Sequence, residues 1–308
     1  MNTAAPETVQ APEDDPWADW LLHQRSAGDP VYEMRIQARV AGYIDHALQR
    51  LPQTAPTSLL DFGCGDGALG LRALQRWPSL RVVFADPSLE LLRRASARAE
   101  AAGVHAHSSF VQLGPRGLDD LPDASFDAVL TRSALAYVPD KPRLLAQWHR
   151  LLGAGGAISL AEPIFRDEAV AACAQRAALE HAADDDAARL LRLLHRWRAH
   201  QFPDTEQALA ESCHCNFSER DLFAWAAQAG FGDLRLELHI ESGPSLAPDW
   251  DRFTRHTPHP YAKSLRDVLD WECGAEERTL LEGLLRHSWE QGRIVSVERM
   301  AYLSARRP

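Results

Sequence analysis

The sequence predicts an α/β fold in which a mostly parallel β-sheet is covered by helices on both faces. Two observations lead to this prediction. Apolar runs typical of strands alternate with amphipathic runs typical of helices over residues 58–162, and such alternation indicates a parallel sheet. In addition, a turn with glycine at three alternate positions joins the first expected strand to the helix that follows it. A turn of this kind lets a ligand lie directly on the backbone beside a helix N-terminus.

The expected elements of the first half follow from apolar spacing and from start signals. Two helical stripes, at 16–27 and 31–50, precede the sheet, and Asp29-Pro30 between them is a helix-start signal. Ser88 is expected to cap the helix after the second strand. The expected core strands lie at 58–63, 80–86, 108–113, 126–132 and 156–162, and the helices between them at 67–77, 88–102 and 140–152.

The second half adds helices to the core. A long helical stretch covers 166–212, and its acidic tract at 184–186 is expected to start a helix at 186–199, because carboxylates favour a helix N-terminus. A helix that begins at Ser218 and stops at Gly230 precedes a strand at 234–240. A second insertion at 243–292 holds a proline-rich loop and helical patterns at 262–272 and 276–291, and the last strand is expected at 294–303.

The glycine-rich turn at 61–67 (DFGCGDG) differs from the dinucleotide fingerprint in its spacing and in the acidic residue ahead of it. Asp61 would repel a pyrophosphate, whereas it suits a ligand with an ammonium group. Asp86, at the end of the second expected strand, can accept both hydroxyls of a ribose. Adenosine joined to an amino acid without phosphate is S-adenosylmethionine, and we expect the turn to bind this cofactor.

Four segments resemble, in the same order, the motifs of class I S-adenosylmethionine-dependent methyltransferases. Residues 61–67 match the first motif and 86–88 the ribose site, while 126–138 and 151–160 match the fourth-strand and fifth-strand motifs. The resemblance is close over 57–165 and loose over 217–305. It implies a Rossmann-like, seven-stranded, mostly parallel sheet with an antiparallel last strand. The chain departs from the family after the third strand, where the turn at 114–120 is longer and rich in proline and glycine.

The resemblance implies an enzyme that methylates a small molecule with S-adenosylmethionine as its cofactor. Tyr137 and Glu162 are candidates to orient or deprotonate the acceptor, and Arg132 to hold a carboxylate of cofactor or substrate. The alternatives are that Tyr137 packs on the cofactor and that Glu162 forms a structural ion pair. The expected cofactor-binding residues are Asp61, Gly63, Cys64, Gly65, Gly67, Asp86, Pro87, Leu118, Thr131, Arg132, Ser133 and Arg25.

The helical additions are expected to form a lid over this site. Ligands of parallel sheets bind at the carboxyl ends of the strands, and both insertions and the N-terminal helices are expected at that edge. Together they would enclose a largely apolar pocket. The expected organisation is a disordered tail at 1–15, lid helices at 16–56, a cofactor-binding core at 57–165, 217–242 and 293–308, and lid or substrate insertions at 166–216 and 243–292.

Composition and charge argue against several classes of partner. The net charge is −10, and no basic cluster is free of interleaved acids, so nucleic acid is not an expected partner. No apolar run approaches the ~20 residues that span a membrane. The first residues lack a signal-peptide pattern, and the expected location is therefore the cytoplasm. The expected partner is a small molecule, with a homodimer left open.

Five irregularly spaced cysteines predict no disulfide framework, and no metal centre is expected. Cys213-His214-Cys215 is the one suggestive group, but it lacks the second ligand pair of a zinc site. The alternative functions are an arsenic- or thiol-directed methyltransferase, a non-catalytic S-adenosylmethionine-binding protein and a dehydrogenase-like nucleotide binder. The spacing around Asp61 argues against the last of these.

Overall fold

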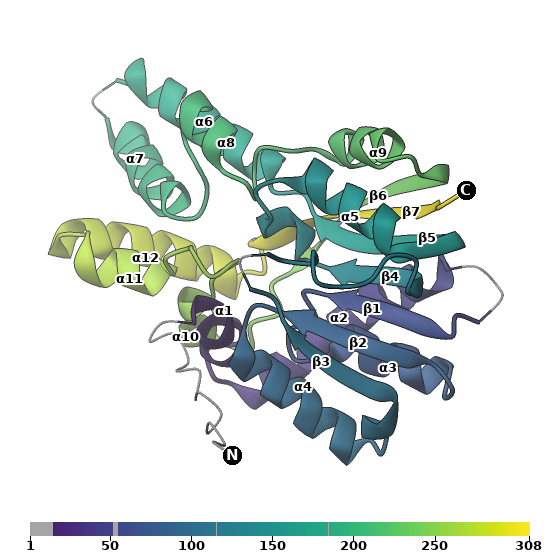
Figure 1. Ribbon diagram of the computed structural model, residues 1–308. Coiled ribbons are helices and arrows are strands. Elements are labelled where there is room, and N and C mark those ends of the chain that lie inside the picture. The colour runs from purple at the N-terminus through teal and green to yellow at the C-terminus, as the bar shows by residue number, and fades with distance from the viewer. Residues whose placement is uncertain (1–14, 52–54, 115, 184) are drawn as a thin grey trace, which may run out of the picture.

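A computed structural model describes residues 15–51, 55–114, 116–183 and 185–308 (Figure 1). The tail expected at 1–15 therefore lies outside the described residues except for Asp15. Within the described part, one seven-stranded sheet has the order β3-β2-β1-β4-β5-β7-β6. β7 runs antiparallel to β5 and β6, while the other neighbouring strands are parallel. This confirms the predicted sheet. The strands are β1 (Ser58–Phe62), β2 (Arg81–Asp86), β3 (Ser108–Gln112), β4 (Phe126–Arg132), β5 (Leu152–Pro163), β6 (Gly232–Pro244) and β7 (Val295–Arg306).

One face of the sheet is covered by α2 (Pro30–Gln49), α3 (Ala68–Arg76) and α4 (Leu89–Ala101). Their apolar sides form a common core with the strands, which includes Ile44, Leu74 and Leu92. The expected start signals are confirmed. The Asp29 carboxylate accepts a hydrogen bond from the backbone N–H of Tyr32 at 2.8 Å, and the Ser88 hydroxyl accepts one from Leu91 at 3.1 Å.

The opposite face is covered by α5 (Lys141–Leu151) and α9 (Glu219–Gln228). Trp148 of α5 is fully buried, and Leu222 and Ala226 of α9 pack into the same core. The short 3₁₀ helices η2 (His105–His107) and η3 (Leu135–Tyr137) lie in the connections before β3 and after β4. The molecule therefore has three layers, with the sheet in the middle.

Three helical additions lie towards one end of the sheet, on the left in Figure 1. The N-terminal addition is α1 (Pro16–Asp19) with the π-helix η1 (Trp20–Gln24). The first insertion holds α6 (Arg166–Glu180), α7 (Asp186–Ala199) and α8 (Glu206–Glu211). The second holds α10 (Trp250–Arg255), α11 (Leu265–Trp271) and α12 (Ala275–Glu290). The two insertions share an apolar core, in which Leu193 meets Trp250 and Leu265. Asp185 caps α7 through the N–H of Ala188, as the acidic tract predicts.

The structure differs from the prediction in a few elements. β5 begins at Leu152 instead of residue 156, and β6 extends beyond the predicted 234–240 at both ends. The added residues of β6 are paired with the long β7, for example Ser242 with Val297. The helix α10 was not predicted, and the first helical stripe contains a π-helical turn. No helix in the described ranges is both long and apolar enough to cross a membrane.

Candidate cofactor and substrate site

A cavity of about 1030 Å³ lies at the carboxyl ends of the parallel strands. Ligand sites commonly have ~300–1,000 Å³, so this cavity has room for two ligands side by side. Its lining includes residues that follow β1, β2, β4 and β5 and side chains from all three helical additions. Trp17 comes from the N-terminal addition, Trp197 from the first insertion and Tyr261 from the second. The expected meeting of the three additions over the carboxyl edge is therefore found in the structure.

The turn after β1 needs glycine at its alternate positions for two different reasons. Gly63 and Gly65 line the cavity and have φ values of +64° and +54°. A Cβ atom added at Gly63 would stand 2.2 Å from the Cβ of Ala134. Gly67 does not line the cavity; an added Cβ there would stand 3.0 Å from Ala95 of α4. Gly63 thus keeps the turn close to the segment after β4, whereas Gly67 lets α3 pack closely on α4.

Asp86 lies on the cavity wall at the end of β2, with Pro87 beside it. Its side chain is held by two backbone donors: Gly65 N–H donates to Oδ2 at 2.8 Å, and Ser88 N–H donates to Oδ1 at 2.9 Å. Burial raises the pKa of Asp86, and the two hydrogen bonds oppose this rise. Each carboxylate oxygen keeps a second lone pair, so Asp86 is fixed in place and still able to accept hydroxyl groups.

Asp61 is placed differently from the prediction. Its side chain does not line the cavity, is 1% exposed, and accepts a hydrogen bond from the backbone N–H of Gly70 at 2.8 Å. Burial raises the pKa of Asp61 to about 7, against the effects of the Gly70 hydrogen bond and the Arg132 charge. Asp61 therefore anchors the first turn of α3 to β1, and the predicted direct contact with an ammonium group is not supported by this geometry.

Arg25 and Arg132 supply positive charge to the cavity wall. Arg25 is buried and forms an ion pair with Glu33. Arg132 donates from Nη1 to the hydroxyl of Ser133 at 3.2 Å, and no ion pair joins it to a carboxylate of the described residues. Burial and the nearby Arg25 charge lower the pKa of Arg132. The charges of Asp66, Glu162 and Asp61 act on Arg132 in the opposite direction. Because Arg132 is a half-buried cation that forms no ion pair with the described residues, this part of the cavity favours an anionic ligand group.

Aromatic side chains form the part of the cavity under the helical additions. Tyr137 lies at their centre, with its ring 4.5 Å from Trp17, 5.8 Å from His214 and 6.3 Å from Tyr261, measured between ring centroids. Burial, and then the Glu162 charge, raise the pKa of Tyr137. Tyr137 is therefore a neutral phenol at pH 7 and can donate a hydrogen bond.

Glu162 lies directly behind this compartment and does not line the cavity. Its side chain is 0% exposed and accepts hydrogen bonds from three consecutive backbone N–H groups, those of Ala134 (3.2 Å), Leu135 (3.2 Å) and Ala136 (3.1 Å). Burial raises the pKa of Glu162 to about 7, and these hydrogen bonds oppose the rise. Glu162 therefore holds η3, which carries Tyr137, and its predicted contact with an acceptor is not supported by the geometry.

Two other predicted cofactor contacts also lie away from the cavity. Leu118 and Thr131 are buried and absent from its lining. Leu113, Gly114 and Gly117, from the connection after β3, line the cavity instead. Glycines in a connection next to a ligand-binding strand end are the sequence signal that could have identified this wall, but from the sequence they indicated only a departure from the family. The predicted residues that do line the cavity are Arg25, Gly63, Cys64, Gly65, Asp86, Pro87, Arg132, Ser133 and Tyr137.

His256 lines the cavity, although the sequence did not distinguish it from the other histidines. Its Nδ1 lies 2.9 Å from the carbonyl oxygen of Arg25. A carbonyl only accepts, so Nδ1 carries the proton and Nε2 of the neutral ring is an acceptor. Burial lowers the pKa of His256, which keeps the ring neutral at pH 7. Among sequence features, only the position of His256 in the proline-rich loop could have suggested that it lines the cavity.

The group Cys213-His214-Cys215 has a structural role in the described residues. Lys141 donates from Nζ to the carbonyl oxygen of Cys213 at 2.6 Å, and Cys215 is fully buried. The imidazole of His214 is stacked on Tyr137. This segment therefore supports the aromatic compartment from the side of the first insertion.

Part of the chain is similar in sequence to known methyltransferases. Residues 59–156 match the family model described as a methyltransferase domain. The chain is 35% identical to trans-aconitate 2-methyltransferase of Mycobacterium sp. (strain KMS) over 116 residues, which are 38% of this chain and 42% of that enzyme. It is 36% identical to nocamycin O-methyltransferase of Saccharothrix syringae over 107 residues, which are 34% of this chain and 38% of that enzyme. These matches span less than half of the length of either relative.

The fold is also similar to that of phosphoethanolamine N-methyltransferase 2 of Haemonchus contortus, solved in complex with S-adenosyl-L-methionine. The TM-score is 0.50 with 15% identity, and the match covers 95% of this chain and 60% of that chain. The strand order with its antiparallel last strand is that of the Rossmann-like methyltransferase fold, and residues 59–156, which match the methyltransferase domain, lie in the parallel part of the sheet. The predicted fold is thereby confirmed, and the matched segment supports the predicted family.

Proposed function

We propose that this chain transfers a methyl group from S-adenosylmethionine to a small molecule enclosed under the helical additions. One observation carries the proposal: a continuous cavity joins the glycine-rich turn and Asp86 to the aromatic compartment around Tyr137. The cofactor end and the acceptor end of a methyl transfer would then share one space, which the additions screen from water.

At the cofactor end, Asp86 would accept the ribose hydroxyls while the turn at Gly63 and Gly65 lets the ligand lie on the backbone. Arg132, together with Arg25, would hold the carboxylate of the amino-acid part, since Arg132 is without an acidic partner among the described residues. The connection after β3, with Leu113, would cover the base. The acceptor would then bind in the remaining part of the cavity, around Tyr137.

Methyl transfer from a sulfonium is an in-line displacement, so alignment of donor and acceptor is the main task of the protein. Orientation can lower such barriers by up to ~7–11 kcal/mol. The neutral phenol of Tyr137 would orient the acceptor, because its raised pKa prevents it from acting as a base. The name of the relative nocamycin O-methyltransferase supports an oxygen atom as the acceptor.

If that oxygen loses a proton during transfer, Nε2 of His256 would accept it. Base catalysis of this kind contributes ~10²–10⁴-fold. In His256→Gln, cofactor affinity measured by calorimetry should stay within about twofold, because the lost group acts on the acceptor. Methyl transfer from radiolabelled cofactor to a panel of small-molecule acceptors should fall by roughly 10²-fold. An unchanged rate would remove His256 from the mechanism.

Calorimetry with S-adenosylmethionine and S-adenosylhomocysteine tests the proposal itself. We expect the unmodified chain to bind both with micromolar affinity. Asp86→Asn should weaken binding by at least about tenfold, because it removes a charge-assisted acceptor of ribose hydroxyls. Asp120→Asn, at a site where the aspartate side chain is 63% exposed, is the matched control and should bind normally. Absence of binding heat with both ligands would refute the proposal, and binding without methyl transfer to any acceptor would favour a non-catalytic cofactor-binding protein.

A further inference from the structure

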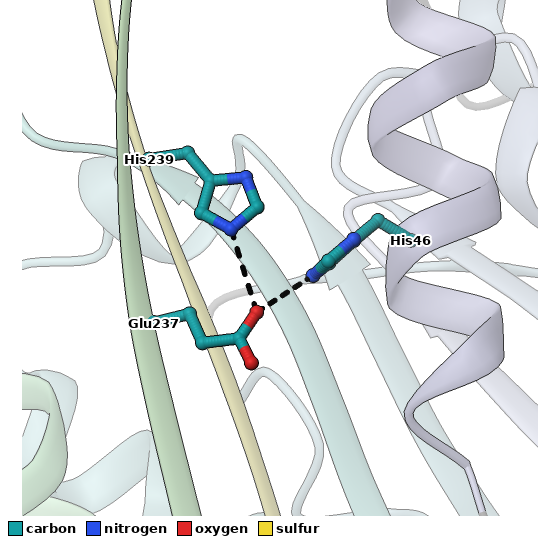
Figure 2. A group of neighbouring side chains, drawn as sticks. All are labelled: His46, Glu237 and His239. Atoms are coloured by element: carbon teal, nitrogen blue, oxygen red, sulfur yellow. Dashed lines mark hydrogen bonds and ion pairs between the residues drawn. The ribbon is translucent and has the colours of Figure 1, made fainter.

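A cluster of two histidines and a glutamate lies outside the cavity, between α2 and the edge strand β6 (Figure 2). His46 projects from α2, and Glu237 and His239 project from β6. His46 Nε2 lies 3.0 Å from Glu237 Oε2, and His239 Nε2 lies 3.4 Å from the same oxygen. One nitrogen or oxygen atom of each residue lies within 4.8 Å of those of the other two. None of the three residues lines the cavity.

We propose that His46, Glu237 and His239 bind one Zn²⁺ ion. Bonds of ~2.1 Å at tetrahedral angles place the ligand atoms ~3.4 Å apart, and the two separations given above, 3.0 and 3.4 Å, agree with that spacing. Two imidazoles and one carboxylate are a known ligand set for zinc, with the fourth position left to water. The site goes beyond the proposed methyl transfer and does not depend on it.

The backbone and the neighbouring rings hold these three side chains close together before any metal ion binds. Glu237 and His239 are two positions apart on a strand, and such residues point to the same face. The ring of Tyr302 lies 4.1 Å from that of His46 and 4.9 Å from that of His239, between centroids. The three side chains are only 26–38% exposed. The three side chains would therefore lose little conformational freedom when a metal ion binds.

The guanidinium of Arg50 lies where the proposed metal ion would bind. It forms an ion pair with Glu237 Oε2 and lies 3.2 Å from His46 Nε2. Zinc would displace Arg50 from Oε2. The contacts of Glu237 with His46, Arg50 and His239 all go to Oε2, which leaves Oε1 available. Arg50 could then pair with Oε1. Because Arg50 competes with the ion, its removal should strengthen metal binding.

Zinc titration of the metal-free protein, in competition with a chromophoric chelator, tests the proposal. We expect one Zn²⁺ per chain, at least tenfold weaker binding in His46→Ala and in His239→Ala, and tighter binding in Arg50→Ala. His287→Ala, at an exposed helical histidine, is the matched control and should bind as the unmodified chain does. Melting temperatures without metal should show that all variants are folded.

A Co²⁺ spectrum distinguishes this site from the cysteines. Ligation by nitrogen and oxygen gives d–d bands without the thiolate-to-cobalt charge-transfer band. Zinc should also raise the melting temperature of the unmodified chain but not that of His46→Ala, because a ligand stabilises the state that binds it. The proposal is overturned if the unmodified chain binds no zinc, if His46→Ala and His239→Ala bind it as tightly, or if the cobalt spectrum shows thiolate ligation.

Discussion

At the scale of the residue, Gly63 combines backbone strain with a close contact. In Gly63→Ala the left-handed φ would cost ~1–2 kcal/mol, and the new Cβ would also collide with Ala134 at 2.2 Å. We expect a loss of at least about 3 kcal/mol in the free energy of unfolding and a loss of cofactor binding. Both are measured by urea denaturation and calorimetry.

Gly103→Ala is the control for this prediction. Gly103 has a φ of +70°, but no atom lies within 4 Å of an added Cβ. It isolates the cost of the backbone conformation, which should be ~1–2 kcal/mol, with normal cofactor binding. Equal effects of the two substitutions would mean that the contact with Ala134 is unimportant.

His259 makes the stability of the protein depend on pH. It is 1% exposed, Nε2 lies 2.6 Å from the carbonyl oxygen of Gln201, and Nδ1 accepts from Tyr261 N–H at 3.3 Å. Burial, followed by the charge of His214, lowers the pKa of His259 to about 4 from its ordinary value of 6.5. The unfolded chain therefore binds a proton more readily, and stability present above pH 6.5 is lost as the pH falls towards 4.

From pH 7 to pH 5 this single group should lower the free energy of unfolding by about 2 kcal/mol. His259→Gln keeps a donor for the Gln201 carbonyl and cannot be protonated, so its loss of stability over the same range should be smaller by about that amount. Denaturant unfolding at the two pH values measures the difference. Parallel losses in the two proteins would show that His259 is not the responsible group.

Single residues were predictable from the sequence where the chemistry is local. The positions of Gly63, Gly65 and Asp86 follow from the strand–turn–helix pattern alone. The contacts of Asp61 and Glu162 could not be predicted in this way, because both carboxylates are buried. Each lies at a strand end, but its partners are the backbone N–H groups of a neighbouring segment, and the path of that segment depends on the tertiary fold.

At the scale of the element, η3 is shaped by Glu162, whose two oxygens accept three N–H groups. In Glu162→Gln the amide keeps one acceptor oxygen and turns a donor towards another donor. We expect a loss of about 2–3 kcal/mol in the free energy of unfolding and a higher KM, because Tyr137 moves with η3. A rise in KM with little change in kcat is the readout that separates this positioning role from acid–base catalysis.

Elements with strong apolar periodicity were predicted well, whereas elements defined by pairing were not. α7 was predicted with its bounds because an acidic cap precedes a clear apolar stripe. β6 was predicted too short, since the pairing of its polar end with β7 is visible only in the sheet. The short α10 carries an Asp249 cap, but the tryptophan and phenylalanine that bury it do so against the other helices of the insertions.

At the scale of the whole molecule, the cavity wall is assembled from segments far apart in the sequence. Trp20 Nε1 donates to the carbonyl of Thr257 at 3.2 Å, and His256 contacts the carbonyl of Arg25. The N-terminal addition and the second insertion are thus joined over the cavity. A ligand that touches both should stabilise this contact, since binding favours the conformation that makes it.

Amide hydrogen exchange with S-adenosylhomocysteine tests this coupling. At early exchange times, ligand at about 100 times its Kd should slow exchange in residues 16–24 and 253–261 as well as in the glycine-rich turn. Global opening is suppressed by ~2.7 kcal/mol under these conditions, so only amides that exchange by local opening are compared. Residues 93–101 of α4 lie outside the cavity lining and should be unaffected, and Asp86→Asn should show no protection at the same ligand concentration. Protection confined to the turn and the end of β2 would mean that the additions close independently of the cofactor, and that acceptor binding alone orders them.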